Sequence, residues 1–122
     1  MHSVYEAVGG HPWFEALIDR FYAGVATDPL LRPLYPDDLT ASKDHMVKFL
    51  VQYWGGPATY SEERGHPRLR MRHAPFVITI AERNAWVRHM VKAIEAGDLP
   101  AEIEEQMIGY FDMAATHMIN TA

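Results

Sequence analysis

The feature that most constrains this chain is the stretch from Gly55 to Phe76, which glycine and proline break repeatedly. It opens with a Gly-Gly-Pro sequence that stops a helix, and Pro75 limits any helix near its end. The sequence on either side has helical periodicity and shows no convincing strand alternation. The fold is therefore predicted to consist of helices with one long ordered loop among them.

Helix signals divide the rest of the chain. Capping boxes that begin at Ser3 and Thr79 mark two helix starts, and Gly97 is predicted to cap a C-terminus. Asp28 followed by proline predicts a brief helical turn, and prolines at 33 and 36 predict an irregular corner. The longer helices are predicted over about 12–25, 40–54, 79–96 and from 100 onward. The result is an all-α chain of five or six helices, forming a single domain over residues 1–122.

Apolar residues in the longer helices recur at the spacing that gives each helix one buried face. The predicted core residues are Phe14, Leu17, Ile18, Phe21, Tyr22 and Val25, then Ser42, Met46, Phe49, Leu50 and Tyr53, then Trp86, Met90, Ala93 and Ile94, and finally Ile103, Met107, Tyr110, Phe111, Ala114 and Met118.

Composition excludes several classes of protein. A chain of 122 residues that is 48% hydrophobic can form one globular core. The net charge of −5 argues against general nucleic-acid binding. The chain has no cysteine, which excludes disulfides, thiolate metal ligands and covalent haem attachment. It shows no cleavable signal and no apolar run of roughly 18 residues, so we expect a soluble cytoplasmic protein with no membrane span.

A basic cluster stands out against this acidic background. Arg64, Arg68, Arg70 and Arg72 fall within nine residues that contain no carboxylate, and His73 follows them. An imidazole on a short helical turn beside arginines suits a metal cofactor with anionic groups, such as haem with its iron and two propionates. A surface basic loop with a solvated histidine is the more common interpretation of such a composition.

The other histidines and motifs give weaker signals. His2 and His11 are expected to be solvated and His66 to lie in a loop, whereas His45 is close to an inner helix face. The chain has no H-E-x-x-H zinc motif, no phosphate-binding loop and no G-x-S-x-G sequence. A dispersed serine triad stays open, but nothing favours it.

Tyr22, Tyr35 and Trp86 each combine an aromatic ring with one polar hydrogen. Core packing is the ordinary role of such side chains on a buried helix face. A buried donor without a partner costs roughly 1–3 kcal/mol, so each needs an acceptor. Two such donors that face a common cavity could bind each other, a backbone carbonyl or a polar ligand.

Several segments match one protein family together. The matching residues are Tyr5-x-x-Val8-Gly9-Gly10, Arg20-Phe21-Tyr22-x-x-Val25, Leu34-Tyr35-Pro36, Phe49-Leu50-x-Gln52-Tyr53-Trp54-Gly55-Gly56-Pro57, Tyr60-x-Glu62, Gly65-His66-Pro67-x-Leu69-Arg70-x-Arg72-His73-x-Pro75-Phe76 and Trp86. They span nearly the whole chain, and the segment 52–76 is highly specific. On these residues the chain resembles the truncated haemoglobins, specifically their second group.

The resemblance implies a two-over-two helical sandwich around haem b (iron protoporphyrin IX), with an ordered loop in place of most of the proximal helix. It implies His73 as the proximal iron ligand and Tyr22, Tyr35 and Trp86 as distal polar groups, with Trp86 also touching the cofactor. The remaining implied cofactor contacts are Arg72, Tyr60 and His45 at the propionates and Met46, Phe49 and Leu50 along the haem. Ser42 stands where larger globins carry a distal histidine, and its small side chain leaves an entry path. No catalytic residue is implied.

Three functions stay open at this point. The first is reversible binding of dioxygen, carbon monoxide, nitric oxide or similar ligands at haem. The second is a nitric oxide dioxygenase or peroxidase-like enzyme that uses an external reductant or a reductase partner. The third is a haem-free helical domain whose arginine-rich loop binds an anion. A homodimer is also left open, as is a role in oxygen transport.

Overall fold

The computed structural model describes residues 3–122, and His2 lies outside them. The elements in order are α1 (Val4–Ala7), α2 (His11–Ala26), the 3-10 helix η1 (Arg32–Leu34), α3 (Thr40–Tyr53), α4 (Thr59–Arg64), α5 (Leu69–His73), α6 (Ile80–Glu95) and α7 (Ala101–His117). The described chain contains no strand, so the all-α prediction is confirmed. It has seven α-helices where five or six were predicted, because the central stretch itself forms α4 and α5.

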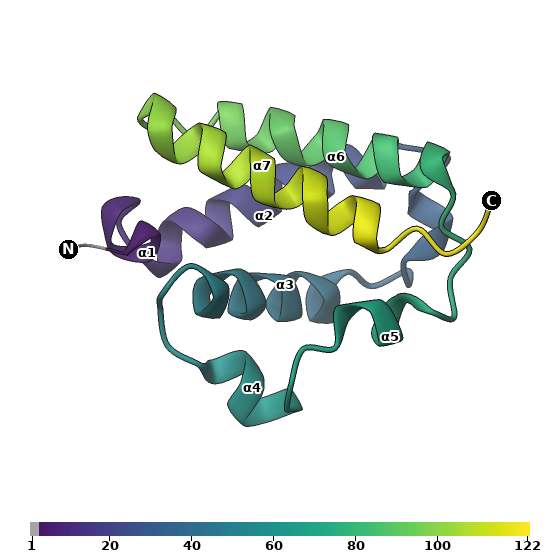
Figure 1. Cartoon of the computed structure of the whole chain (residues 1–122), viewed down its shortest axis with the longest axis horizontal. Coiled ribbons are helices and arrows are strands. Elements are labelled where there is room, and N and C mark those ends of the chain that lie inside the picture. Colours follow the sequence, from purple (N-terminus) through teal and green to yellow (C-terminus); the bar gives the residue numbers. More distant parts are fainter. Residues whose placement is uncertain (1–2) are drawn as a thin grey trace.

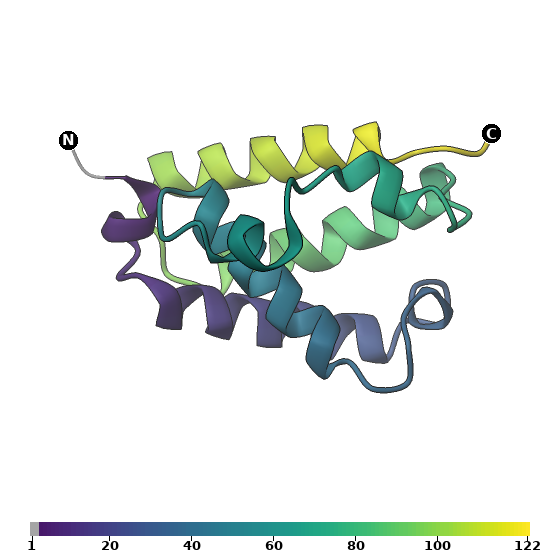
Figure 2. The same cartoon turned by 90° about the horizontal axis from the view of Figure 1, so that it is seen from below.

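Two helix pairs make up the body of the molecule. α2 packs against both α3 and α6, and α6 packs against α7, which gives the predicted two-over-two arrangement (Figure 1). α1 and the chain end after α7 lie at opposite ends of the molecule in both views (Figures 1 and 2). α4 packs against α3, and α5 follows it in the part of the chain that connects α3 to α6. The core between the helices is one cluster of buried apolar side chains.

Helix starts follow the local signals in the sequence. The Ser3 side chain accepts a hydrogen bond from the Glu6 backbone N–H, and the Thr79 capping box is complete, with both of its reciprocal bonds formed. The C-terminal prediction for α6 needs correction, because Ala96 is the cap and Gly97 follows it. Gly97 is needed for close approach instead, since a Cβ there would lie 2.8 Å from Cζ2 of Trp13.

The corner between α2 and α3 begins with the predicted brief turn. Oδ1 of Asp28 accepts from the Leu30 N–H at 2.9 Å and caps this turn, and the Asp28 carbonyl oxygen accepts from the Arg32 N–H at 2.8 Å. The Arg32 guanidinium then donates to three carbonyl oxygens in a row, those of residues 35, 36 and 37. These bonds fix the backbone that carries Tyr35. No local sequence pattern predicted these bonds, because arginine is usually a solvated side chain.

α3 uses two faces rather than the single predicted one. Val47, Leu50 and Val51 are buried, whereas Tyr53 is 49% exposed and was wrongly assigned to the core. The predicted stripe that contains Ser42, Met46 and Phe49 is half-buried and lines a cavity. α3 packs one face on α2 and turns another face to the cavity. Its apolar residues therefore cover a wider arc of the helix than a single buried stripe would.

Gly109 in the middle of α7 allows a stability prediction. A Cβ there would meet no atom within 4 Å, and the residue is exposed in a regular helix. Gly109→Ala should therefore raise the free energy of unfolding by about 0.5–1 kcal/mol, because alanine loses less backbone entropy on folding. Urea unfolding should show a higher midpoint with an unchanged slope.

Gly24→Ala is the matched control for that substitution. A Cβ at Gly24 would collide with Nδ1 of His89 on α6, so this variant should be less stable. An equal loss of stability in both variants would contradict the account of Gly109.

Within residues 3–122, each helix is either too short or too polar to span a bilayer.

Candidate functional site

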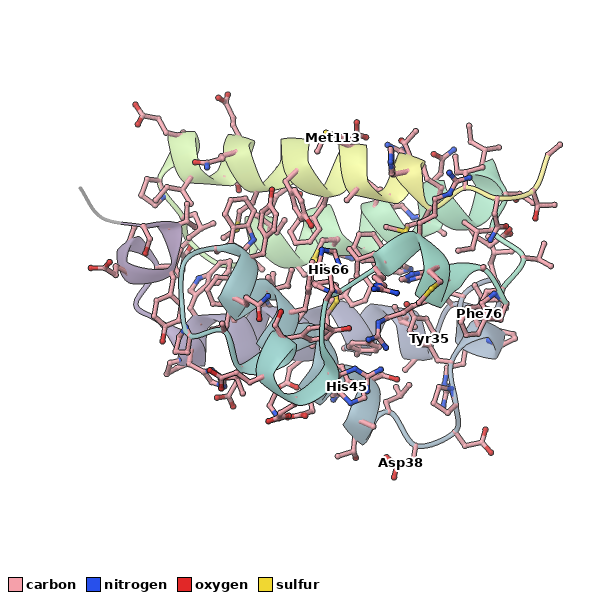
Figure 3. All side chains as sticks on the ribbon, turned by 60° about the horizontal axis from the view of Figure 1, so that its bottom comes forward. Tyr35, Asp38, His45, His66, Phe76 and Met113 are labelled. Atoms are coloured by element: carbon pink, nitrogen blue, oxygen red, sulfur yellow. The ribbon has the colours of Figure 1, made fainter. Side chains whose placement is uncertain are left out.

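A cavity of about 420 Å³ lies between α3 and α5 and is closed by side chains from α2, α6, α7 and the corner at residues 31–36. Its wall includes eight of the predicted site residues, namely Tyr22, Tyr35, Ser42, His45, Met46, Phe49, His73 and Trp86. In Figure 3, Tyr35, His45 and Phe76 lie around the region between α3 and α5, whereas Met113 points outward from α7. Residues far apart in the sequence thus share one wall.

His73 ends α5 and faces this cavity. Its Nδ1 lies 2.6 Å from the carbonyl oxygen of Leu69, one helical turn earlier. A carbonyl oxygen can only accept, so Nδ1 carries the proton and donates. In the neutral ring Nε2 then keeps its lone pair, which is the arrangement usual for a metal-ligating histidine.

The surroundings of His73 fit haem better than a bare metal ion. Among residues 3–122, no three His, Asp or Glu side chains gather closely enough to hold a metal ion. One imidazole suffices for iron that a porphyrin already holds. The cavity wall is also largely apolar, with Leu34, Phe49 and Phe111 among its residues, as a porphyrin face requires.

The segment after His73 is fixed by a residue that the sequence analysis missed. The Asn120 side-chain amide donates to the carbonyl oxygens of Phe76 at 2.8 Å and His73 at 3.3 Å. Its Oδ1 accepts from the N–H of Ile78 at 3.0 Å. The chain end after α7 thereby holds the backbone on which His73 sits. No local sequence signal could reveal contacts with residues more than forty positions away.

Three further polar side chains at the cavity wall are aromatic. Tyr22 comes from α2, Tyr35 from the corner and Trp86 from α6, and all three line the wall. The Tyr22 and Tyr35 rings meet edge to face, with centroids 5.5 Å apart. Phe21 packs against both Tyr22 and Trp86 at 5.1 Å and fixes their relative positions. The three donors therefore sit in rigid packing.

Burial keeps both phenols protonated. It raises the pKa of Tyr22 far above its ordinary value, and the nearby Tyr35 adds to the effect. Burial also raises the pKa of Tyr35 to about 12, although a hydrogen bond with Trp86 opposes part of that rise. Both hydroxyl groups are consequently available as donors at neutral pH.

His45 and Arg64 form a polar pair at the cavity. Nη1 of Arg64 lies 3.0 Å from Nε2 of His45, and both residues line the wall. A guanidinium group only donates, so Nε2 of His45 accepts and the ring is neutral in this contact. Partial burial, followed by the charge of Arg64, lowers the pKa of His45 and favours that neutral form. A cation beside a neutral imidazole suits an anionic group such as a propionate.

Three predicted contacts lie outside the cavity wall. Leu50 is fully buried, and Tyr60 is 4% exposed and packs behind Phe49 with ring centroids 5.6 Å apart. Arg72 lies over the Tyr60 ring, and its guanidinium donates to the carbonyl oxygens of Pro67 and Arg64. These contacts show that Arg72 holds the loop backbone in its conformation. Its contact with a propionate stays a prediction.

Arg72→Ala should lower the free energy of unfolding of the protein. It removes two charge-assisted hydrogen bonds to loop carbonyls, and such bonds contribute about 1.5–3 kcal/mol each. We expect a net loss of about 1–3 kcal/mol after relaxation of the loop, together with faster haem loss. Urea unfolding and transfer of haem to an acceptor protein measure the two effects.

Arg70→Ala is the matched control. Arg70 lies two residues before Arg72, and its exposed side chain has no hydrogen bond or ion pair among residues 3–122. It should change stability by less than about 0.5 kcal/mol. Equal effects of the two substitutions would show that the loop bonds of Arg72 contribute nothing specific.

Several cavity residues were not predicted as site residues from the sequence. Leu69, Phe76, Glu82, Arg83 and Tyr110 also contribute to the wall. Tyr110 was predicted as core from its helical spacing, and spacing alone cannot distinguish a core residue from a cavity residue. Arg64 belonged to the basic cluster, which was a usable signal for its position at the cavity.

Comparison with known proteins gives a consistent result. A family model described as bacterial-like globin matches residues 3–120. The chain is 45% identical to the group 2 truncated hemoglobin YjbI of Bacillus subtilis, over 98% of this chain and 89% of that protein.

Solved structures agree in fold. The hemoglobin of Chloroflexus aurantiacus superposes with a TM-score of 0.96 at 50% identity, covering 98% of this chain and 99% of that one. A truncated oxygen-avid haemoglobin from Bacillus subtilis superposes with a TM-score of 0.92 at 44% identity, covering 98% and 100%.

Proposed function

This chain belongs to the bacterial-like globin family, among its group II truncated haemoglobins, and on that premise we propose that it binds dioxygen reversibly at haem b. Family membership implies a haem cofactor and haem-based binding of small ligands. The alternative of a haem-free helical domain that binds an anion is therefore not supported. The observation that carries the oxygen proposal is the convergence of Tyr22, Tyr35 and Trp86 on the cavity that His73 also lines.

Haem in this cavity would supply an iron atom that binds dioxygen and gives the ligand partial negative charge. Nε2 of His73 is the nitrogen left free for that iron. The Tyr22 and Tyr35 hydroxyls and the Trp86 indole N–H then act as donors to the ligand. Donors in fixed positions need little reorganisation and slow the release of a polar ligand. The solved Bacillus subtilis relative is described as oxygen-avid, which supports the same direction here.

The other proposed roles follow from position. Met46, Phe49 and Ser42 line the wall from α3, where the first two offer apolar contact and Ser42 leaves room for ligand entry. His45 and Arg64 are the groups that we propose for a propionate, with Arg72 and Tyr60 as support behind them. Leu50 then acts through the packing of α3 rather than by direct contact.

A second candidate is nitric oxide dioxygenase or peroxidase-like chemistry with an external reductant. The protonated phenols in the cavity favour it as well, because they can donate to a developing negative charge on a reacting oxygen. Carbon monoxide and nitric oxide are further expected ligands, and a reductase is the expected partner for this activity.

The test is an oxygenation cycle followed by nitric oxide. Reduced holoprotein should give an oxygenated absorption spectrum in air and return to the ferrous spectrum when oxygen is removed. Stoichiometric loss of the oxygenated spectrum with nitric oxide, followed by recovery with cell reductant, would favour the dioxygenase. Immediate oxidation in air without an oxygenated spectrum would overturn reversible oxygen binding.

Four further properties of the protein stay predictions. They are that residues 1–122 form a single domain, that the protein is cytoplasmic, that it takes part in oxygen transport, and that it forms a homodimer.

A further inference from the structure

An exposed tyrosine is stacked on a tyrosine of the cavity wall. Tyr53 ends α3 and is 49% exposed. Tyr110 lies on α7 and lines the cavity. Their ring centroids are 4.1 Å apart with an interplanar angle of 28°, which is the closest ring pair among the described residues. Two oxidisable rings therefore connect the cavity wall to the surface.

The neighbouring aromatic contacts extend this pair inward. Tyr110 packs on Phe111 at 5.1 Å, and Phe111 packs on Trp86 at 5.8 Å. Trp54 touches both tyrosines, at 4.9 Å from Tyr53 and 5.5 Å from Tyr110. Phenol and indole rings lose one electron more readily than other side chains. The stack thus has the chemistry of an electron relay as well as that of a packed core.

We propose that Tyr110 and Tyr53 form a one-electron relay, through which a small phenol at the surface reduces the haem site after a peroxide has reacted there. This inference rests on the proposed haem function. It adds, for the peroxidase-like alternative, a specific site at which the reductant is oxidised. Tyr110 is the inner member because it lines the cavity. Tyr53 is the outer member, because its ring is 49% exposed and a phenol can contact it at the surface.

The electrons and protons balance with two phenol molecules. Hydrogen peroxide takes up two electrons and two protons, its O–O bond breaks, and two water molecules form. In each relay step Tyr110 gives one electron inward and recovers it from Tyr53, which releases its hydroxyl proton to water. A phenol molecule then gives Tyr53 one electron and one proton and leaves as a phenoxyl radical. Two such steps restore the resting protein.

Solvent exposure decides which tyrosine holds the radical. A tyrosine radical is stable only when its proton has an acceptor, because the cationic phenol is a very strong acid. Burial, with Tyr53 as a secondary cause, raises the pKa of Tyr110 to about 12, and its hydroxyl has no hydrogen bond within residues 3–122. Tyr53 reaches water directly. The tyrosine radical should therefore form mainly on Tyr53.

The experiment uses ferric holoprotein, hydrogen peroxide and a nitroso spin trap, with the adducts located by mass spectrometry. Wild type should carry the adduct on Tyr53, and Tyr110→Phe should lose it. Tyr53→Phe should lose the adduct and also most of the oxidation rate of 2-methoxyphenol. Tyr5→Phe is the matched control, because Tyr5 stacks on Phe14 outside the cavity wall. It should behave like wild type.

The carbon monoxide spectrum of every variant reports whether that variant binds haem. It therefore distinguishes failure of the relay from failure of haem binding. Wild type that binds haem and carbon monoxide but leaves Tyr53 unmodified would overturn the relay alone. An undiminished Tyr53 adduct in Tyr110→Phe would overturn the role of Tyr110. Wild type that holds no haem would overturn the relay together with the proposed function.

Discussion

His73→Ala is expected to yield a folded protein that retains little or no haem. The Nδ1–H of His73 is committed to the carbonyl of Leu69, so Nε2 is the free nitrogen that the substitution removes from the cavity wall. Haem stabilises the folded state by selective binding, by about 2.7 kcal/mol when its concentration is a hundred times its dissociation constant. The variant should lose this contribution and melt at a lower temperature.

His45→Ala and His66→Ala are the controls for this result. His45 lines the cavity but is paired with Arg64, and His66 is exposed with Nδ1 accepting from the Arg68 N–H. Both variants should keep the ferrous absorption spectrum. If His73→Ala keeps a normal five-coordinate ferrous spectrum while one of these two loses it, the iron ligand is assigned to the wrong residue.

Tyr22→Phe and Trp86→Phe should each release dioxygen about tenfold to a hundredfold faster than wild type. A hydrogen bond to a ligand that carries partial charge contributes roughly 1.5–3 kcal/mol, and 1.4 kcal/mol corresponds to a factor of ten. Tyr22→Phe keeps the ring that packs on Phe21 and Tyr35, so it removes little besides the hydroxyl. Stopped-flow displacement of dioxygen measures the rates.

Carbon monoxide distinguishes lost hydrogen bonding from altered packing. Its outer atom carries less negative charge, so its release should change less in both variants. This control matters most for Trp86→Phe, which also shrinks a ring in contact with Phe21 and Phe111. The double variant should be non-additive, because both donors address one ligand and Tyr35 lies close enough to substitute. Equal acceleration for both gases would mean that the residues act by packing.

Local patterns in the sequence predicted much of the fold. The capping box at Thr79 formed as predicted, Ser3 caps α1 with its side chain, and the apolar spacing of α2 identified its buried residues. Periodicity failed at Tyr53, because an apolar arc on a helix can face a cavity or a neighbouring ring instead of the core. The side of a helix that faces a cavity is a tertiary property.

The site was predictable where its residues carry a specific family motif and not where they act by long-range contact. His73 lies in the highly specific segment 52–76, and the structure places it on the cavity wall. The bonds of Asn120 to the His73 segment depend on how the chain end folds back. Likewise, the bonds of Arg72 to loop carbonyls need the loop conformation, which composition does not specify.

Haem titration of the apoprotein tests the central claim most directly. We predict one equivalent of bound haem with a Soret band that shifts when the protein is reduced and exposed to carbon monoxide. The same titration of His73→Ala should give no saturable complex of this kind. Wild type that shows no saturable Soret band, or an unaltered titration of His73→Ala, would contradict haem binding through His73.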